Sequence, residues 1–129
     1  MTRHSQSYYE FGPFRLYPDE RRLCRDHEVV SLPPKVCELL LVMVQHPGQI
    51  LDREELMKAV WPDTVVEEAN LNVHVSALRK ALCETSSERY IETLPRRGYR
   101  FLAHVKETID ENYDLAMQAE TSQPGSVAS

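Results

Sequence analysis

The sequence predicts an α+β fold, in which a small N-terminal antiparallel sheet is followed by three helices and a C-terminal β-hairpin. Three observations carry this prediction. Short alternating runs separated by turn residues fill the first 32 residues, three segments between residues 34 and 82 carry apolar residues at helical spacing, and two β-like runs follow them. At 129 residues, the chain has room for one domain with tails.

The N-terminal sheet is predicted from four short runs at residues 9–11, 14–17, 22–24 and 29–32. The dipeptides Gly12-Pro13, Pro18-Asp19 and Asp26-His27 separate these runs, and all three are turn-forming. Short runs with such turns between them favour neighbouring antiparallel strands.

The first helix is predicted over residues 34–45, where apolar side chains recur at every third or fourth position. Pro34 suits a first helical turn, and His46-Pro47-Gly48 is typical of a helix end. Pro33 precedes the helix and offers no hydroxyl to cap it.

Two more helices follow. Asp52 and Glu55 have the spacing of a reciprocal capping box, so the second helix begins there and ends near Trp61-Pro62. The third spans residues 67–82, where Leu71, Val75, Leu78 and Leu82 form the apolar stripe.

The hairpin is predicted from residues 90–94 and 99–103, which are joined by Pro95-Arg96-Arg97-Gly98. Beyond residue 105 the chain is polar and acidic. We therefore expect a disordered N-terminal tail over residues 1–7, one domain over 8–105, and an acidic linker or tail over 106–129.

The net charge of −5 at first argues against a polyanionic partner. The distribution changes that conclusion. Residues 71–104 carry six basic and three acidic side chains, a local charge of +3, whereas residues 51–70 and 105–129 carry −4 each. A basic segment between acidic segments is compatible with binding to nucleic acid.

Other function classes find little support. No apolar run is long enough to span a bilayer and no secretory signal is visible, so we expect a cytoplasmic protein. The three cysteines form no Cys-x-x-Cys pair, so we expect small, buried or half-buried thiols. The five histidines are scattered, and there is no phosphate-binding glycine loop. We expect no enzyme activity, cofactor, metal site or small-molecule substrate.

The polar face of the third helix is the first functional feature. Asn72, Val73, Ser76, Ala77 and Lys80 share it, and most of them are small. The major groove of B-DNA admits an α-helix, and small side chains allow it to approach the base edges.

The element order and three strings of sequence resemble the OmpR/PhoB-type winged helix-turn-helix domain. The strings are LPPKVCELLLVMVQHPGQILDREELMKAVWPDT, NVHVSALRKAL and IETLPRRGYRF, and the resemblance covers roughly residues 9–104. The string PRRGYRF is similar to the wing of the one-component, CadC- or ToxR-like regulators. Those relatives carry the domain at the amino terminus, and a longer natural protein could be tethered to a membrane.

The resemblance implies sequence-specific binding to double-stranded DNA by a transcriptional regulator, with the third helix in the major groove and the wing in the minor groove. The implied contacts of the recognition helix are Asn70, Asn72, Val73, His74, Ser76, Ala77, Arg79 and Lys80. The implied contacts of the wing and the DNA backbone are Trp61, Thr93, Arg96, Arg97, Tyr99 and Arg100. The loop that meets RNA polymerase in some relatives corresponds to Asp63, Thr64, Glu67 and Glu68.

This chain departs from better-known members at Ser76 and Ala77, where a pair of arginines is common. Weaker base discrimination, or more reliance on Val73 and DNA shape, is the expected consequence. The small basic area suggests that two copies bind repeated half-sites.

Structural alternatives remain open for several of these residues. Trp61 and His74 are equally compatible with the edge of the core, Arg79 and Lys80 with a solvated helix end, and Arg100 with an outward strand position. The alternative function is a winged helix that docks RNA polymerase or another protein.

Overall fold

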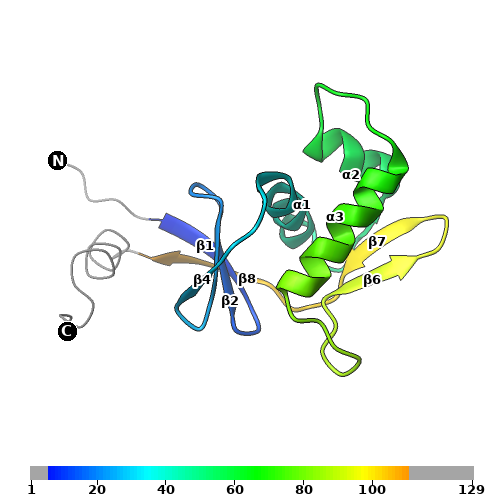
Figure 1. Cartoon of the computed structure of the whole chain (residues 1–129). Coiled ribbons are helices and arrows are strands. Elements are labelled where there is room, and N and C mark those ends of the chain that lie inside the picture. The colour runs from blue at the N-terminus through cyan, green and yellow to red at the C-terminus, as the bar shows by residue number, and fades with distance from the viewer. Residues whose placement is uncertain (1–5, 111–129) are drawn as a thin grey trace, which may run out of the picture.

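The computed structural model describes residues 6–110, which form three helices and two antiparallel sheets (Figure 1). The predicted α+β winged-helix fold is confirmed. Along the described chain the elements are β1 (Gln6–Phe11), β2 (Phe14–Tyr17), β3 (Arg22–Arg25), β4 (Glu28–Val30), α1 (Pro34–Gln45), β5 (Ile50–Asp52), α2 (Arg53–Val60), α3 (Glu68–Ala81), β6 (Ile91–Leu94), β7 (Gly98–Phe101) and β8 (Lys106–Asp110).

The first sheet has five strands in the order β4-β3-β2-β1-β8. Its last strand corrects the expected boundaries. β8 pairs antiparallel with β1 from Gln6↔Asp110 to Glu10↔Lys106, so residues 106–110 belong to the sheet and not to a linker, and residues 6–7 belong to β1 and not to a tail. The alternation of residues 106–110 is too short and too polar to be distinguished from a linker before its partner strand is known. The rest of both expected tails, residues 1–5 and 111–129, lies outside the described residues.

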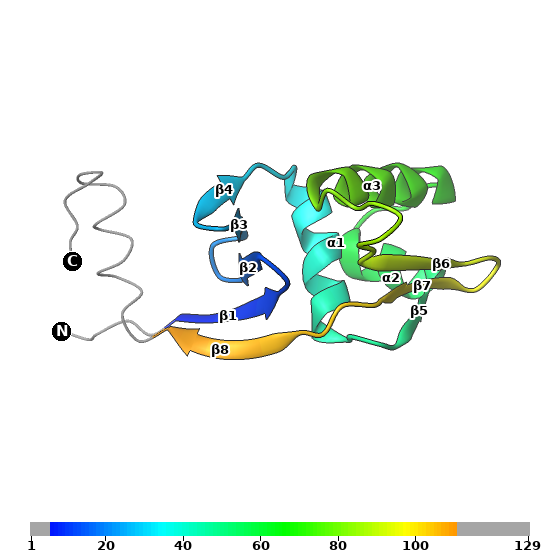
Figure 2. The same cartoon turned by 90° about the horizontal axis from the view of Figure 1, so that it is seen from below.

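The hydrophobic core lies between this sheet and the helices. α1 is central, with the first sheet on one side and α2 and α3 on the other (Figure 2). The predicted apolar face of α1 is buried. The helix supplies seven buried residues: Val36, Cys37, Leu39, Leu40, Leu41, Met43 and Val44. Phe11, Phe14 and Phe101 join the core from the two sheets. The core thus fixes α3 against both α1 and the hairpin.

The helix ends follow the expected local chemistry. The Asp52 carboxylate accepts the Glu55 backbone N–H at 2.7 Å, and the Glu55 carboxylate accepts the Asp52 backbone N–H at 3.0 Å, which is the predicted capping box. α1 begins after Pro33 without a side-chain cap. The ammonium of Lys35 instead donates to the Val60 carbonyl at 2.8 Å, so α1 stabilises the C-terminal end of α2.

The second sheet is the wing. Its order is β5-β7-β6, and the sequence did not predict β5 because it has only three residues. β6 and β7 form a hairpin that projects from the helices at the end opposite to β8 (Figure 2). Among residues 6–110, no helix is long and apolar enough to span a membrane.

Candidate nucleic-acid interface

The outer face of α3 carries the predicted base-facing side chains. Leu71, Val75 and Leu78 turn inward and are buried, whereas Asn72, Val73, Ser76, Ala77 and Lys80 are exposed. Val73 is 63% exposed. The face is therefore made of mostly short side chains and is open to solvent, with Val73 and Ala77 as its apolar members.

One edge of α3 is joined to the wing by Arg79. Its Nη2 donates to Thr93 Oγ1 at 2.6 Å and to the Ile91 carbonyl at 3.1 Å, and its Nε lies 3.3 Å from Glu84 Oε1. The Glu84 carboxylate also accepts the backbone N–H groups of Tyr90 and Ile91, each at 2.8 Å. Arg79 and Thr93, both predicted as DNA contacts, are thus engaged with each other and position β6 beside α3.

The N-terminal half of the same edge is joined to the wing by Asn72. The Tyr99 hydroxyl donates to Asn72 Oδ1 at 2.7 Å, and Arg53 Nη1 donates to the same oxygen at 3.4 Å. The Arg53 Cζ lies 5.6 Å from the centre of the Tyr99 ring, within range of a cation–π contact. These three side chains come from α2, α3 and β7, and we call them the Asn72 cluster.

The wing tip is a four-residue turn. The Arg97 backbone N–H donates to the Leu94 carbonyl at 2.9 Å, Pro95 takes the second position of the turn, and Arg96 the third with φ of 66°. Proline followed by a residue with positive φ is the pattern of a type II turn. Both arginines are exposed, and neither forms an ion pair with another described residue.

Arg100 differs from the arginines at the tip. It lies opposite Glu92 across the hairpin, and its Nε and Nη2 donate to Glu92 Oε1 at 2.9 and 2.7 Å. The side chain of Arg100, predicted to point outward, therefore forms a cross-strand ion pair. Such a half-exposed pair contributes about 0–1 kcal/mol and leaves Arg100 less available to a ligand than Arg96 and Arg97.

Trp61 and His74 pack against each other at the N-terminal end of the interface. Their ring centres are 4.9 Å apart in an edge-to-face arrangement, and the His74 Nδ1 lies 2.7 Å from the Asn70 carbonyl oxygen. Trp61 is half-buried against the core. The pair joins the end of α2 to the first turns of α3, as the core-edge alternative requires, and both rings stay partly exposed.

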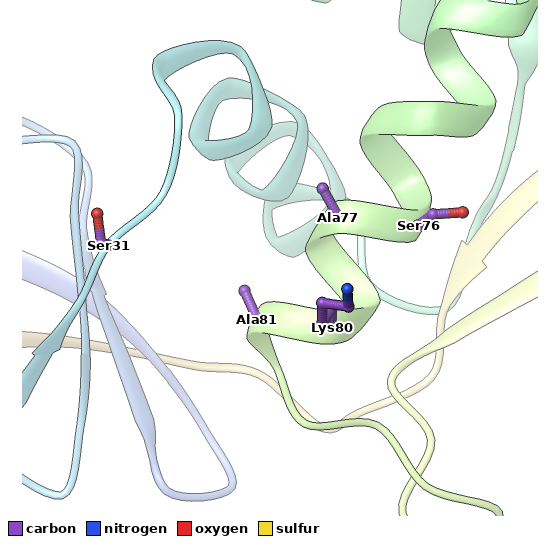
Figure 3. Close-up of a pocket in the computed structure, with 5 residues that line it drawn as sticks. All are labelled: Ser31, Ser76, Ala77, Lys80 and Ala81. Carbon is purple, nitrogen blue, oxygen red and sulfur yellow. The ribbon is translucent and has the colours of Figure 1, made fainter.

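The other edge of α3 borders a shallow open depression of about 400 Å³. It lies between α3 and the segment that follows β4, and it is lined by Ser31, Ser76, Ala77, Lys80 and Ala81. In Figure 3, Ala77 and Ala81 point toward the segment that carries Ser31, and the Ser76 hydroxyl points away from it. The small alanine side chains leave this edge of the helix uncovered.

The acidic segment between α2 and α3 is separate from the wing tip (Figure 1). Asp63, Thr64 and Glu67 are exposed there, Glu68 is exposed as the first residue of α3, and Val65 is 99% exposed. The predicted partner-binding residues therefore lie on one accessible stretch of the chain.

The sequence reasoning missed Arg53. A cation in the first turn of a helix opposes the helix dipole, so an arginine at the start of α2 indicates an interaction outside the helix. Arg53 interacts with Asn72 and with the ring of Tyr99. Within residues 6–110, no group of three or more histidine, cysteine or acidic side chains is arranged to hold a metal ion.

The exposure of Cys83 contradicts the expectation that all three thiols are buried or half-buried. No disulfide joins the three cysteines; Cys37 is buried and Cys24 half-buried as expected, but Cys83 is exposed just after α3. Cys83 adopts a positive φ of 55° where the chain leaves the helix, which turns its side chain out of the apolar stripe.

Comparisons with known proteins agree with this architecture. The family model described as "Transcriptional regulatory protein, C terminal" matches residues 27–101. Transcriptional regulator HilA of Salmonella typhimurium is 37% identical over 97 residues, which are 75% of this chain and 17% of HilA. Transcriptional activator CadC of Escherichia coli is 30% identical over 102 residues, 78% of this chain and 20% of CadC. Transcriptional regulatory protein SrrA of Staphylococcus aureus is 34% identical over 101 residues, 76% of this chain and 42% of SrrA.

Solved structures give the same result. The DNA-binding domain of E. coli CadC superimposes with a TM-score of 0.70 at 30% identity, covering 80% of this chain and 98% of that domain. The DNA-binding domain of Klebsiella pneumoniae RstA, in complex with the RstA box, superimposes with a TM-score of 0.65 at 30% identity, covering 75% and 98%.

The chain spans less than half the length of each of these three curated relatives. The predicted resemblance, including that to CadC, is confirmed by sequence and by fold. The chain belongs to the family of transcriptional regulatory proteins with an OmpR/PhoB-type winged helix-turn-helix domain.

Proposed function

We propose that this domain binds double-stranded DNA sequence-specifically as part of a cytoplasmic transcriptional regulator, with α3 in the major groove and the wing in the adjacent minor groove. The single observation that best supports this is the exposed face of α3, which stands beside a hairpin whose two tip arginines have no ion-pair partner among residues 6–110. The RstA domain, similar in fold, is solved with a DNA site.

The roles divide by chemistry. Asn72, Val73 and Ser76 are proposed to meet base edges, because they are short and project from the open face of α3. Lys80 at the end of that face is proposed to contact phosphate. Arg96 and Arg97 are proposed to enter a narrow minor groove, where the negative potential of A·T-rich DNA is concentrated.

Four of the remaining predicted contacts divide into two groups. Trp61, His74 and Asn70 are half-buried or exposed at the start of the interface and are proposed to approach the DNA backbone. Arg79 is proposed to position the wing, because its guanidinium already has three partners within the domain.

Two copies on repeated half-sites are proposed for tight binding. Of the basic side chains predicted to contact DNA, only Lys80, Arg96 and Arg97 are exposed, while the whole chain carries −5. Few phosphate contacts per copy imply modest affinity, which falls with salt in proportion to their number.

The deciding experiment is enrichment of a randomised duplex pool by the purified chain at low salt. We expect a recurring motif, shortened or lost in a double variant with Arg96→Ala and Arg97→Ala. Failure of the folded wild-type chain to enrich any sequence, alone or fused to a dimerising partner, would contradict the proposal.

The role of Arg97 gives a narrower prediction. Arg97→Ala should weaken binding to the selected duplex by about tenfold and relax the A·T preference under the wing, because one minor-groove guanidinium is lost. Fluorescence anisotropy on duplexes with A·T or G·C at that position measures both effects. Arg100→Ala is the matched control, since its guanidinium is paired with Glu92; an isotherm that Arg97→Ala leaves unchanged would exclude the minor-groove contact.

A second candidate function is docking of RNA polymerase or another protein through the loop at residues 62–68. The observation that favours it is Val65, an apolar side chain that is 99% exposed among exposed acids. Val65→Ser should reduce transcription activation in a reporter assay while leaving the DNA isotherm unchanged. Equal loss of DNA binding would argue against a separate partner.

A further inference from the structure

We propose that Tyr99 and Arg53 set the side-chain amide of Asn72 so that it offers only hydrogen-bond donors to DNA, which makes Asn72 select guanine, or more weakly thymine, and reject adenine at one position of the site. This inference rests on the proposed function. It assigns Asn72 as a specificity-determining residue, and Tyr99 and Arg53 as the positioning residues behind it.

The orientation of the amide follows from the chemistry of its two neighbours. The Tyr99 hydroxyl and Arg53 Nη1 lie 2.7 and 3.4 Å from the same atom of Asn72. A guanidinium has five donors and no acceptor, so the atom that faces Arg53 must be the carbonyl oxygen. Turning the amide over would place its N–H groups against those of Arg53.

Both contacts are accepted by the carbonyl oxygen of Asn72, which leaves this oxygen no free lone pair for a base. A carbonyl oxygen has two lone-pair directions, and here each has a donor. The amide nitrogen keeps two N–H groups on an exposed side chain, and they donate to no other described residue. The surface presented to a groove is therefore a pair of donors.

The positioning residues are themselves held in place. The Tyr99 side chain belongs to the core, where Tyr99 is only 3% exposed, and its hydroxyl emerges toward α3. Arg53 is half-buried, with Cζ 5.6 Å from the centre of the Tyr99 ring. Because neither group can swing away freely, the amide is set before any ligand arrives.

The preset amide changes the expected base preference of asparagine. Asparagine ordinarily pairs with adenine by using its oxygen for the N6 amine and its nitrogen for N7. With the oxygen engaged, the N6 amine of adenine finds no free acceptor. Guanine presents two neighbouring acceptors, O6 and N7, and thymine presents O4, so these bases suit a donor-only group. Residue 72 lies in the N-terminal half of α3, the part of a recognition helix that reaches base edges.

The test compares motifs enriched from one randomised duplex pool by the full chain and by three variants, each checked for folding by circular dichroism. Wild-type protein should give a motif with guanine or thymine at one position. Tyr99→Phe keeps the buried ring but frees one lone pair of Asn72, and Arg53→Met frees the other. Each should raise the adenine share at that same position by about fivefold.

Asn72→Asp is the third variant and reverses the donor pattern. One carboxylate oxygen would keep the contacts with Tyr99 and Arg53, and the other would face the groove as an acceptor. The preference at that position should move to cytosine or adenine, whose exocyclic amines donate, by about tenfold in the base ratio. Tyr9→Phe, in β1 of the first sheet, is the matched control and should leave the motif unchanged.

The outcomes separate this inference from the function on which it rests. A wild-type motif that Asn72→Asp leaves the same at every position would overturn base reading by Asn72 while leaving sequence-specific binding intact. A shift with Asn72→Asp but none with Tyr99→Phe or Arg53→Met would overturn the presetting. The absence of any wild-type motif would overturn the proposed function and this inference together.

Discussion

Strand β7 of the wing begins at a glycine, Gly98, that packs directly against the backbone of β5. A Cβ atom on Gly98 would lie 2.0 Å from the Leu51 carbonyl oxygen and 2.7 Å from the Asp52 Cα, and the residue has φ of 148°. Any side chain would force β5 away from β7, and an L-residue disfavours this backbone conformation. This single position therefore controls how closely the wing approaches the start of α2.

Gly98→Ala should lower the free energy of unfolding by about 2–5 kcal/mol, because backbone strain adds to the clash with β5. The midpoint of urea denaturation measures it. Gly48→Ala is the control, since a Cβ there meets nothing within 4 Å, although φ is 79°. It should cost only about 1–2 kcal/mol; equal effects of the two variants would show that the clash with β5 is relieved cheaply.

The cysteines should differ sharply in reactivity. Burial raises the pKa of the Cys37 thiol, which lies in α1 within the core, whereas Cys83 is exposed. Because the thiolate is the reactive form, Cys83 should be alkylated by iodoacetamide in the native protein and Cys37 only after unfolding. Peptide mass spectrometry over time distinguishes them, with Cys83→Ser as the control; early labelling of Cys37 would contradict its burial.

At the scale of the element, α3 depends on the hairpin beside it as much as on its own sequence. It has no side-chain cap at Glu67, and its two edge contacts, Asn72 with Tyr99 and Arg79 with Thr93, both go to the wing. α3 and the wing are therefore joined at two points along this edge. Arg79→Ala would leave the carboxylate of Glu84 without its cation and would loosen both elements together.

The start of α2, by contrast, is capped by a local contact. Asp52→Ala removes one half of the capping box and should destabilise the domain by about 0.5–2 kcal/mol, whereas Asp52→Asn keeps an acceptor oxygen and should cost only a few tenths. Thermal unfolding of the two variants beside the wild type measures this. An Asn variant as unstable as the Ala variant would mean that the charge, and not the capping bond, matters at Asp52.

At the scale of the whole molecule, β8 connects the wing back to the first sheet. The chain leaves β7, passes the core, and pairs with β1 at the end of the molecule opposite to the wing tip (Figure 2). Whatever follows residue 110 in a longer protein would begin from that end, away from the proposed DNA surface. The N-terminal sheet thereby holds both ends of the described chain.

A chain ended after residue 105 should unfold at a temperature roughly 5–10 °C below that of a chain ended after residue 110, because β1 would lose its partner strand. Scanning calorimetry of both, with the full chain as the reference, tests this. The same melting temperature for the two shortened chains would show that the sheet does not depend on β8, and residues 106–110 would again be a linker in energetic terms.

Residue patterns along the chain were enough to predict the three helices, the capping box of α2, the hairpin and the family. These depend on local rules, namely apolar spacing along α1 and α3, the Asp52–Glu55 pair, and the turn residues before Gly98, so neighbours along the chain carry the information. The folded structure was needed to show that β5 and β8 are strands, that Arg79 contacts Thr93, and that Arg53 and Tyr99 contact Asn72. Each of those contacts joins residues far enough apart in the sequence that the local pattern does not indicate the partner. A short polar strand or a lone arginine reveals its role only when folding brings that partner to it.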